Sequence, residues 1–162
     1  MEDASPTTAG PIEPPTFTTA WDRIFDWARR MGVRPVRLGL GCCGFEMLPG
    51  LDPRHDLARF GSEVFRAGPR RGDLLVVAGP VSRKMAPLVR RLWDEMPDPK
   101  WSIALGCCAG RGGAVRTYAV TGGLDRVIPV DVQVPGCPPG PEALLEGLRT
   151  LEMRIGRPEG AP

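Results

Sequence analysis

Histidine is almost absent from the sequence, since His55 is the only one in 162 residues. A nucleophilic cysteine needs a base to activate it, and that base is most often a histidine, so the composition argues against a catalytic thiol. The sequence also lacks any C-x-x-C pair, which is the usual ligand unit of a structural zinc site. If the chain holds a metal, we therefore expect thiolate ligands that come from separate segments.

No apolar stretch comes close to the about 18 uninterrupted residues of a membrane-spanning helix, so we expect any membrane role to be peripheral. No apolar core of a signal peptide precedes the domain, and the cysteines are therefore expected to be reduced thiols in the cytosol. The net charge is only +2, from 21 basic and 19 acidic residues, which is not the basic excess of a nucleic-acid-binding protein. We expect the partners to be proteins.

What the sequence does contain is five cysteines in turns rich in glycine or proline: Cys42, Cys43, Cys107, Cys108 and Cys137. The pair at 42 and 43 cannot both be buried from a strand, because successive side chains of a strand point to opposite faces. A disulfide framework and inert buried thiols are alternatives, but neither explains why all five cysteines follow apolar runs at such turns. We therefore favour a metal site, and spacing alone leaves zinc and an iron–sulfur cluster open.

Apolar runs and turn residues predict one domain over 19–155, between an extended arm at 1–18 and a tail at 156–162. Strands are predicted at 36–41, 74–79, 101–105 and 127–132. Helices are predicted at 19–31, 56–67, 82–92 and 141–155, with a loop at 110–114. The helix at 19–31 is apolar on two sides; we favour packing on its own domain over docking on a partner or a membrane surface.

Buried strands that alternate with helices predict an α/β fold: a single three-layer domain whose four-stranded, mostly parallel sheet is covered on both faces. The functional loops of such a sheet lie at the carboxyl ends of its strands. Cysteines follow the first, third and fourth predicted strands, so four thiolates can converge on one edge of the sheet. A cluster several ångströms wide accepts ligands from scattered loops more readily than one zinc ion does, and the pattern therefore favours a [4Fe–4S] centre.

Several short segments agree with those of one known protein family, both in their order along the chain and in their spacing, and chance does not explain so many agreements. They include Gly-Cys-Cys-x-x-Glu-Met at 41–47, Lys-Met-Ala-Pro at 84–87 and Pro-Val-Asp-Val-x-Val-Pro-Gly-Cys-Pro-Pro at 129–139. Further such segments lie at 56–61, 63–70, 73–79, 96–101 and 141–145. Together they resemble the PSST-type subunit of NADH-quinone oxidoreductase (respiratory complex I), which carries the terminal [4Fe–4S] cluster, over roughly residues 19–155.

This resemblance implies a fold akin to flavodoxin and related to the small subunits of hydrogenases. Carried over by position, it implies that one [4Fe–4S] cluster is held by Cys42, Cys43, Cys108 and Cys137, which leaves Cys107 outside the ligand set. It also implies an electron-transfer subunit of a proton-translocating oxidoreductase, not active alone. Electrons from upstream iron–sulfur clusters would pass through this subunit to a quinone held between it and its large neighbour.

The partners implied by the resemblance are other peripheral-arm subunits, especially the large quinone-site subunit and a ferredoxin-like subunit, together with membrane-arm subunits. The implied location is the cytoplasmic face of the inner membrane, as a peripheral membrane protein of the complex. Two alternatives stay open. One is the small subunit of a related membrane-bound hydrogenase-type complex, and the other is a non-redox structural or assembly subunit that holds a cluster.

Three residues are predicted to face the quinone side: Glu46 and Met47, on the turn after the tandem cysteines, and Met85, on the loop after the second strand. Glu46 could couple reduction of the cluster to protonation, because added negative charge nearby raises the pKa of a carboxyl group. A salt bridge to an arginine is the alternative role for Glu46.

Overall fold

The computed structural model describes residues 32–48, 68–113 and 117–155. The predicted arm at 1–18, the helices at 19–31 and 56–67, and the tail at 156–162 lie outside the described residues. Their structure therefore stays a prediction.

A four-stranded parallel sheet forms the middle of the domain, in the order β1-β2-β3-β4. The strands are β1 (Pro35–Gly39), β2 (Leu74–Ala78), β3 (Trp101–Leu105) and β4 (Val132–Val134). Every residue of β2 is buried, as expected for a central strand whose sequence is a continuous apolar run. In register, Val76 pairs with Arg37 on one side and with Ile103 on the other.

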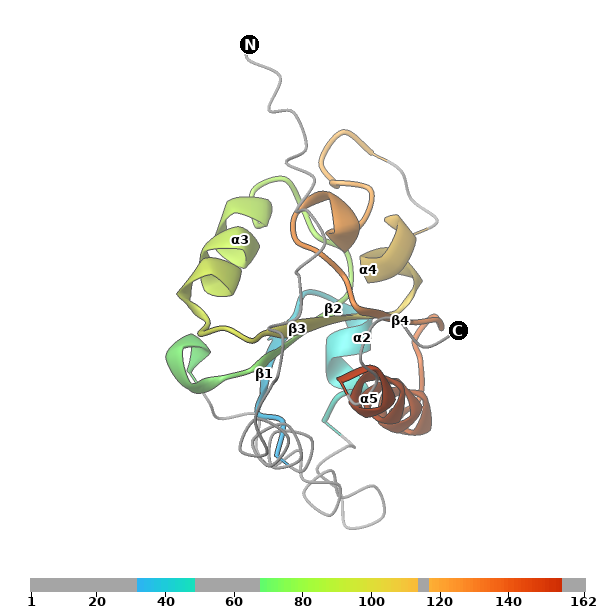
Figure 1. Ribbon diagram of the computed structural model, residues 1–162. Helices are drawn as coiled ribbons and strands as arrows, with labels where there is room; N and C mark the ends of the chain where they lie inside the picture. The colour runs from blue at the N-terminus through green and yellow to red at the C-terminus, as the bar shows by residue number, and fades with distance from the viewer. Residues whose placement is uncertain (1–31, 49–67, 114–116, 156–162) are drawn as a thin grey trace, which may run out of the picture.

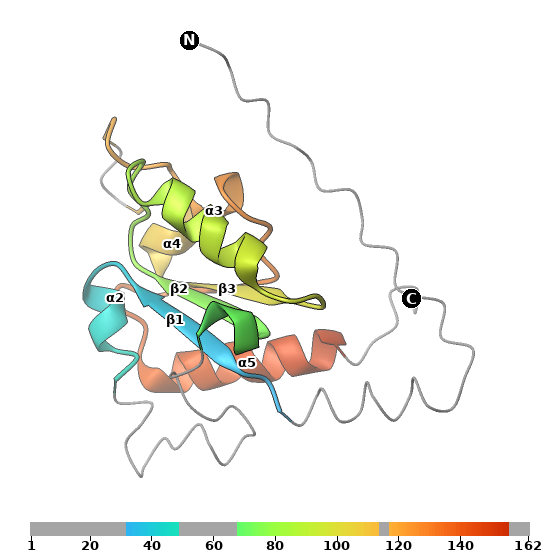
Figure 2. The same cartoon turned by 90° about the vertical axis from the view of Figure 1, so that its left-hand side faces the viewer.

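Helices cover both faces of the sheet, and this confirms the predicted three-layer α/β fold (Figures 1 and 2). On one face lie α3 (Ala86–Glu95), α4 (Cys107–Arg111) and the 3-10 helix η4 (Leu124–Arg126). On the other face lie α2 (Cys42–Phe45) and α5 (Pro141–Ile155), and a further 3-10 helix, η3 (Pro69–Arg71), precedes β2.

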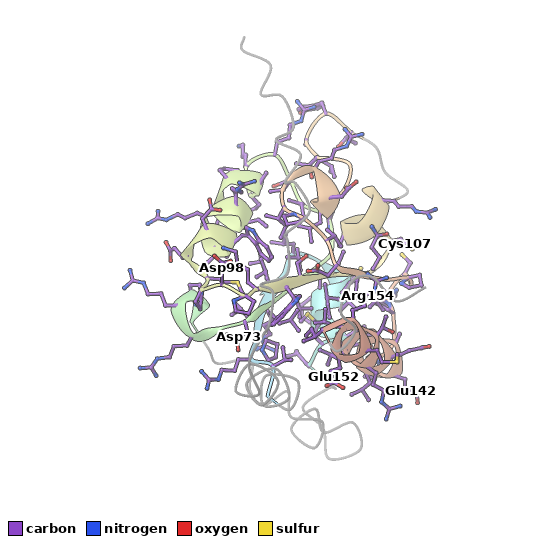
Figure 3. The ribbon with its side chains drawn as sticks, in the orientation of Figure 1. Asp73, Asp98, Cys107, Glu142, Glu152 and Arg154 are labelled. Carbon is purple, nitrogen blue, oxygen red and sulfur yellow. The ribbon has the colours of Figure 1, made fainter. Side chains whose placement is uncertain are left out.

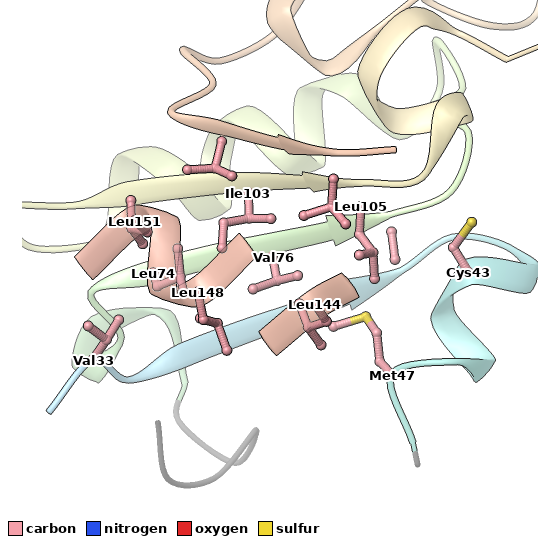
Figure 4. Packing of buried hydrophobic residues seen from close by; sticks show 13 residues of the cluster. Val33, Cys43, Met47, Leu74, Val76, Ile103, Leu105, Leu144, Leu148 and Leu151 are labelled. Atoms are coloured by element: carbon pink, nitrogen blue, oxygen red, sulfur yellow. The ribbon is translucent and has the colours of Figure 1, made fainter. Parts of the chain in front are cut away.

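The long helix α5 holds its layer to the sheet through leucines spaced three and four residues apart. Leu144, Leu148 and Leu151 are buried against Val76 and Ile103 of the central strands, as Figure 4 shows. Spacing of this kind puts the three side chains on one helix face, and it is the pattern that predicts α5 from the sequence. Burial of each leucine contributes roughly 1.5–3 kcal/mol.

The fourth strand is shorter than predicted and lies further along the chain. The prediction of a strand at 127–132 is wrong, because the amides of Val127 and Ile128 donate to the carbonyl of Leu124 in a helical turn. Pro129 then has no amide to donate to a ladder. Asp131 therefore stands just before β4, and not near its end as predicted.

Two further boundaries differ from the prediction. The helix predicted from Ser82 begins at Ala86, because Ser82 caps a preceding turn in which its hydroxyl accepts from the Met85 amide at 3.3 Å. The loop predicted at 110–114 starts two residues later, since Gly110 and Arg111 complete the short helix α4. Its end is fixed by Gly112, whose φ of +79° is in the left-handed region that terminates helices.

Candidate metal centre

The carboxyl ends of the four strands meet at one edge of the sheet, and backbone contacts hold their loops together. The amide of Gly106, after β3, donates to Val134 of β4 at 2.8 Å, and the amide of Cys107 donates to Gly136 at 2.9 Å. At the ends of β1 and β2, an added Cβ on Gly79 would lie 2.8 Å from the nitrogen of Gly41. This edge is the one that carries the cysteines.

Cys43 is the most buried of the five thiols, with 1% of its surface exposed. Its sulfur lies against the backbone of the β3 loop, since an added Cβ at Gly106 would come within 2.5 Å of Cys43 Sγ. Burial raises the pKa of Cys43 to about 11, and the neighbouring charge and hydrogen bond of Cys42 add to this shift, followed by the charges of Cys108 and Cys137.

Cys108 is half-buried on α4, and its sulfur lies beside Gly113, where an added Cβ would be 2.7 Å away. Burial raises the pKa of Cys108, and the charges of Cys137, Cys42 and Cys107 raise it further. These electrostatic contacts join all five cysteines, which come from three strand ends; the four that the resemblance implies as ligands are Cys42, Cys43, Cys108 and Cys137. We refer to these four residues as the thiol group.

Cys107, the fifth cysteine, is exposed, as are Cys42 and Cys137. Cys107 is the first residue of α4, and Figure 3 shows it on the side of the molecule away from α3. The sequence could not separate Cys107 from Cys108 by strand phase. In the structure their surroundings differ, because Cys108 is the one whose sulfur is packed against glycine backbone.

Within 32–48, 68–113 and 117–155, no three histidine, cysteine, aspartate or glutamate side chains close on one point as the ligands of a single metal ion do. A polynuclear cluster takes one thiolate at each of several irons, and a soft all-sulfur donor set suits it. The thiol group could therefore hold an iron–sulfur cluster, with glycine backbone leaving room beside it.

A cavity of about 240 Å³ lies between β1 and the segment that contains α2. Its lining residues are Arg37, Gly39, Gly41, Gly44, Phe45, Met47 and Leu48. Phe45 is 75% exposed and Leu48 is 47% exposed, so an apolar surface continues outward from the cavity. Sequence reasoning missed Phe45, Leu48 and Arg37, although an apolar residue directly after the cysteine turn was a visible signal.

Of the three residues predicted for the quinone side, Met47 lines this cavity and is fully buried. Figure 4 shows its side chain beside Leu144 of α5. Glu46 is half-buried at the end of α2, and Met85 is half-buried at the start of α3; neither lines the cavity. No ion pair joins Glu46 to an arginine in the part of the chain that the structure describes.

Two solved structures contain a chain with a similar fold. A chain of an NAD⁺-reducing [NiFe]-hydrogenase is similar with a TM-score of 0.54 at 19% identity, over 81% of this chain and 96% of that one. A chain of the membrane-bound sulfane sulfur reductase, described as an archaeal respiratory membrane complex, is similar with a TM-score of 0.78 at 37% identity, over 84% of this chain and 77% of that one.

Sequence comparison gives the family. Residues 41–151 match the family described as NADH ubiquinone oxidoreductase, 20 Kd subunit, and the chain belongs to it. NADH-quinone oxidoreductase subunit 6 of Thermus thermophilus is 51% identical over 139 residues, 86% of this chain and 76% of that protein. An NADH-quinone oxidoreductase subunit of Chloroflexus aurantiacus is 51% identical over 140 residues, 86% of this chain and 80% of that protein.

Proposed function

We propose that this protein is an electron-transfer subunit of the peripheral arm of an NADH-quinone oxidoreductase. In this proposal, Cys42, Cys43, Cys108 and Cys137 hold one [4Fe–4S] cluster. When bound, such a cluster takes up and releases electrons at a potential that its protein surroundings set. The observation that carries the proposal is the gathering of four thiols from three strand ends at one edge of the sheet.

The residues around the thiol group support this role. Glycine at 106 and 113 leaves the sulfur atoms of Cys43 and Cys108 free of competing side chains. The buried position of Cys43 lowers the local dielectric constant and limits access of water. Both effects favour a centre that is shielded from solvent on the protein side and open toward a partner on the other.

The cavity lined by Met47 is our candidate for the quinone side. Its lining is mostly apolar, and exposed Phe45 and Leu48 extend it outward, as expected for half of a binding chamber that a large neighbouring subunit completes. A quinone bound in this cavity would receive electrons from the cluster that the thiol group holds. Glu46, at the end of α2 next to this lining, is our candidate for the proton-coupled acid of the site, and Met85 remains a candidate contact.

We further propose that the chain works as a peripheral membrane protein on the cytoplasmic face, in contact with the large quinone-site subunit, a ferredoxin-like subunit and membrane-arm subunits. No helix within the described ranges is both long and apolar enough to cross a membrane. The exposed apolar side chains beside the cavity are the kind of surface that partner subunits cover.

Cysteine substitution tests the proposal directly. After anaerobic reconstitution of the full chain with iron and sulfide, we expect four irons per chain and a low-temperature EPR signal on reduction. Serine at 42, 43, 108 or 137 should abolish or strongly change both, because an alkoxide is a poor substitute for a thiolate. Cys107→Ala is the matched control and should keep both. Unchanged iron and sulfide in all four serine variants would exclude the cluster.

A second candidate is the small subunit of a related membrane-bound hydrogenase-type complex, which the similarity to the sulfane sulfur reductase chain favours. The two candidates differ in the electron acceptor. The purified complex should reduce a soluble quinone such as decylubiquinone if the first is right; reduction of polysulfide or of protons without quinone reduction supports the second. A structural or assembly role predicts a cluster that the complex's own electron donor does not reduce.

A further inference from the structure

Four basic side chains and one tyrosine lie on the α3 and α4 side of the sheet, at the edge where the strands end. Arg83 and Lys84 follow β2, Arg111 ends α4, Arg126 ends η4, and Tyr118 lies in the segment before η4. All five are exposed, and Tyr118 is 88% exposed. We call these five residues the basic surface.

Backbone contacts join the segments of the basic surface into one surface. The amide of Arg83 donates to the carbonyl of Ala119 at 2.8 Å, which places the β2 loop beside the residue that follows Tyr118. An added Cβ at Gly112 would lie 2.5 Å from the Cα of Gly122, so the end of α4 packs on the same segment. An added Cβ at Gly122 would lie 3.5 Å from the guanidinium carbon of Arg126.

The charges of the basic surface differ from those on the neighbouring helix α3. There, Arg90 pairs with Asp94 at 3.3 Å and Arg91 pairs with Glu95 at 3.1 Å. Among the residues that the structure describes, no ion pair compensates the four cations of the basic surface. Asp125, exposed on η4, is the acidic residue next to Arg126 in the sequence, so the surface keeps an excess of positive charge.

We propose that the basic surface is a docking face for an acidic surface of another protein subunit. Arginine and tyrosine are enriched among the residues that contribute most to protein–protein binding. An exposed tyrosine among cations offers an apolar contact that carboxylates can surround.

The position of the basic surface indicates where its partner would lie. Arg111 lies on the same five-residue helix as Cys107 and Cys108, so a partner protein that docks here would sit next to the thiol group. This inference deepens the proposed function, because it supposes that the chain works within a multi-subunit complex. It adds the chemistry of one partner: a surface of aspartates and glutamates, placed next to the cysteine edge.

Charge reversal in the assembled complex tests the inference. Arg83→Glu/Lys84→Glu should weaken retention of the chain in the complex by about tenfold or more, with the loss increasing as NaCl is raised. The matched control is Arg70→Glu/Arg71→Glu, which reverses two exposed arginines on η3, roughly 15 Å away at the other end of β2. The control should leave retention unchanged. Equal retention of both double variants, or equal loss, overturns the inference.

A photo-crosslinker at Tyr118 identifies what covers the surface. Incorporated into the full complex, it should link to a peptide of another subunit that contains aspartate or glutamate. Changing those acidic residues to lysine should restore retention of Arg83→Glu/Lys84→Glu. A link to lipid, a link to a peptide without carboxylates, or no link in an intact complex contradicts the proposal. Single Lys84→Glu and Arg126→Glu variants repeat the measurement if the double variant does not fold.

Iron content separates this inference from the proposed function. The charge-reversal variants should keep four irons per chain, since none of the reversed residues belongs to the thiol group. If the variants keep their iron and charge reversal does not change retention in the complex, only the proposal of a docking face is wrong. If the cysteine variants described above lose no iron, the proposed function is wrong whatever the basic surface does.

Discussion

Cys107 and Cys108 are adjacent residues with different surroundings, and this difference predicts different outcomes of substitution. Cys107 is exposed, whereas the sulfur of Cys108 lies against Gly113 within reach of the other thiols. We expect Cys107→Ala to keep iron and the reduced EPR signal, and Cys108→Ala to lose both. The opposite pattern would assign the ligand to Cys107. An EPR signal that survives in Cys108→Ala but not in the double variant Cys107→Ala/Cys108→Ala would identify Cys107 as a substitute ligand.

Substitution of Gly106 tests whether its close backbone contact with Cys43 is needed for the thiol group to bind iron. Its φ is +89°, and an added Cβ would lie 2.5 Å from Cys43 Sγ. Alanine therefore costs about 1–3 kcal/mol in backbone strain and also displaces the Cys43 side chain. We expect Gly106→Ala to lose most of its iron after reconstitution. Gly140→Ala, where no atom lies within 4 Å of the new Cβ, is the control and should keep it. Equal iron in both variants would show that the close contact is not needed.

At the scale of elements, Asp131 fastens the start of β3 to the segment before β4. Its carboxylate accepts the amide of Ser102 at 2.7 Å, and Arg154 of α5, labelled in Figure 3, donates to its backbone carbonyl. Asp131→Ala leaves the buried Ser102 amide unpaired, and we expect a loss of about 1–3 kcal/mol in the free energy of unfolding. Asp131→Asn keeps an acceptor oxygen and should lose much less. Chemical unfolding of the iron-free chain measures both, and equal losses would contradict the hydrogen-bond argument.

The same carboxyl group predicts a pH dependence. Burial raises the pKa of Asp131, although the Ser102 amide and the charge of Arg154 oppose the shift. Because the folded chain holds this proton more tightly than the unfolded chain, the favourable contribution is complete below the ordinary value of 3.8 and is lost as pH rises through the raised pKa. Asp131→Asn carries no such charge, so its stability relative to wild type should rise over that pH range. A pH-independent difference would show that the pKa is not raised.

Three of the four strands and α5 were predictable from the sequence, because each has an apolar pattern of the right length between turn residues. The fourth strand was misplaced, since Ile128 is buried in a core cluster and Val127 and Val130 pack against that cluster without joining the ladder. Hydrophobicity reports burial and not hydrogen bonding. The short helices α2 and α4 were also not predictable, because glycine-rich segments have low helix propensity and are shaped here by contacts between loops.

The cysteine edge was predictable for a different reason, which is topology. In a parallel sheet, segments far apart in sequence end at the same edge, so cysteines after three strands had to meet. The cavity beside β1 and the basic surface could not be predicted in this way. Each depends on how loops from several elements pack on one another, as the contact between Gly112 and Gly122 illustrates.

At the scale of the whole molecule, the sheet and the cysteine edge depend on different interactions. Residues of β2 are fully buried between two apolar layers, whereas Cys42 and Cys107 are exposed at the starts of the short helices α2 and α4, and Cys137 is exposed after β4. Bound metal stabilises only the state that presents its ligands, so its contribution should be concentrated in these short segments. Removal of the cluster is therefore expected to affect the two parts of the domain unequally.

Hydrogen exchange before and after anaerobic chelation of iron measures this difference. We expect amides at 41–48, 106–113 and 134–140 to lose protection by about tenfold or more, which corresponds to about 1.4 kcal/mol of local opening free energy. Amides of β2 and β3 should keep theirs, because the two strands pair with each other, and the apolar cluster beneath them consists mainly of residues of the strands and α5, although Cys43 belongs to it. The iron-free Cys43→Ser variant is the control and should show no further change on chelation. If protection falls equally throughout the sheet, the cluster and the core form one cooperative unit, and the cysteine edge does not open separately from the sheet.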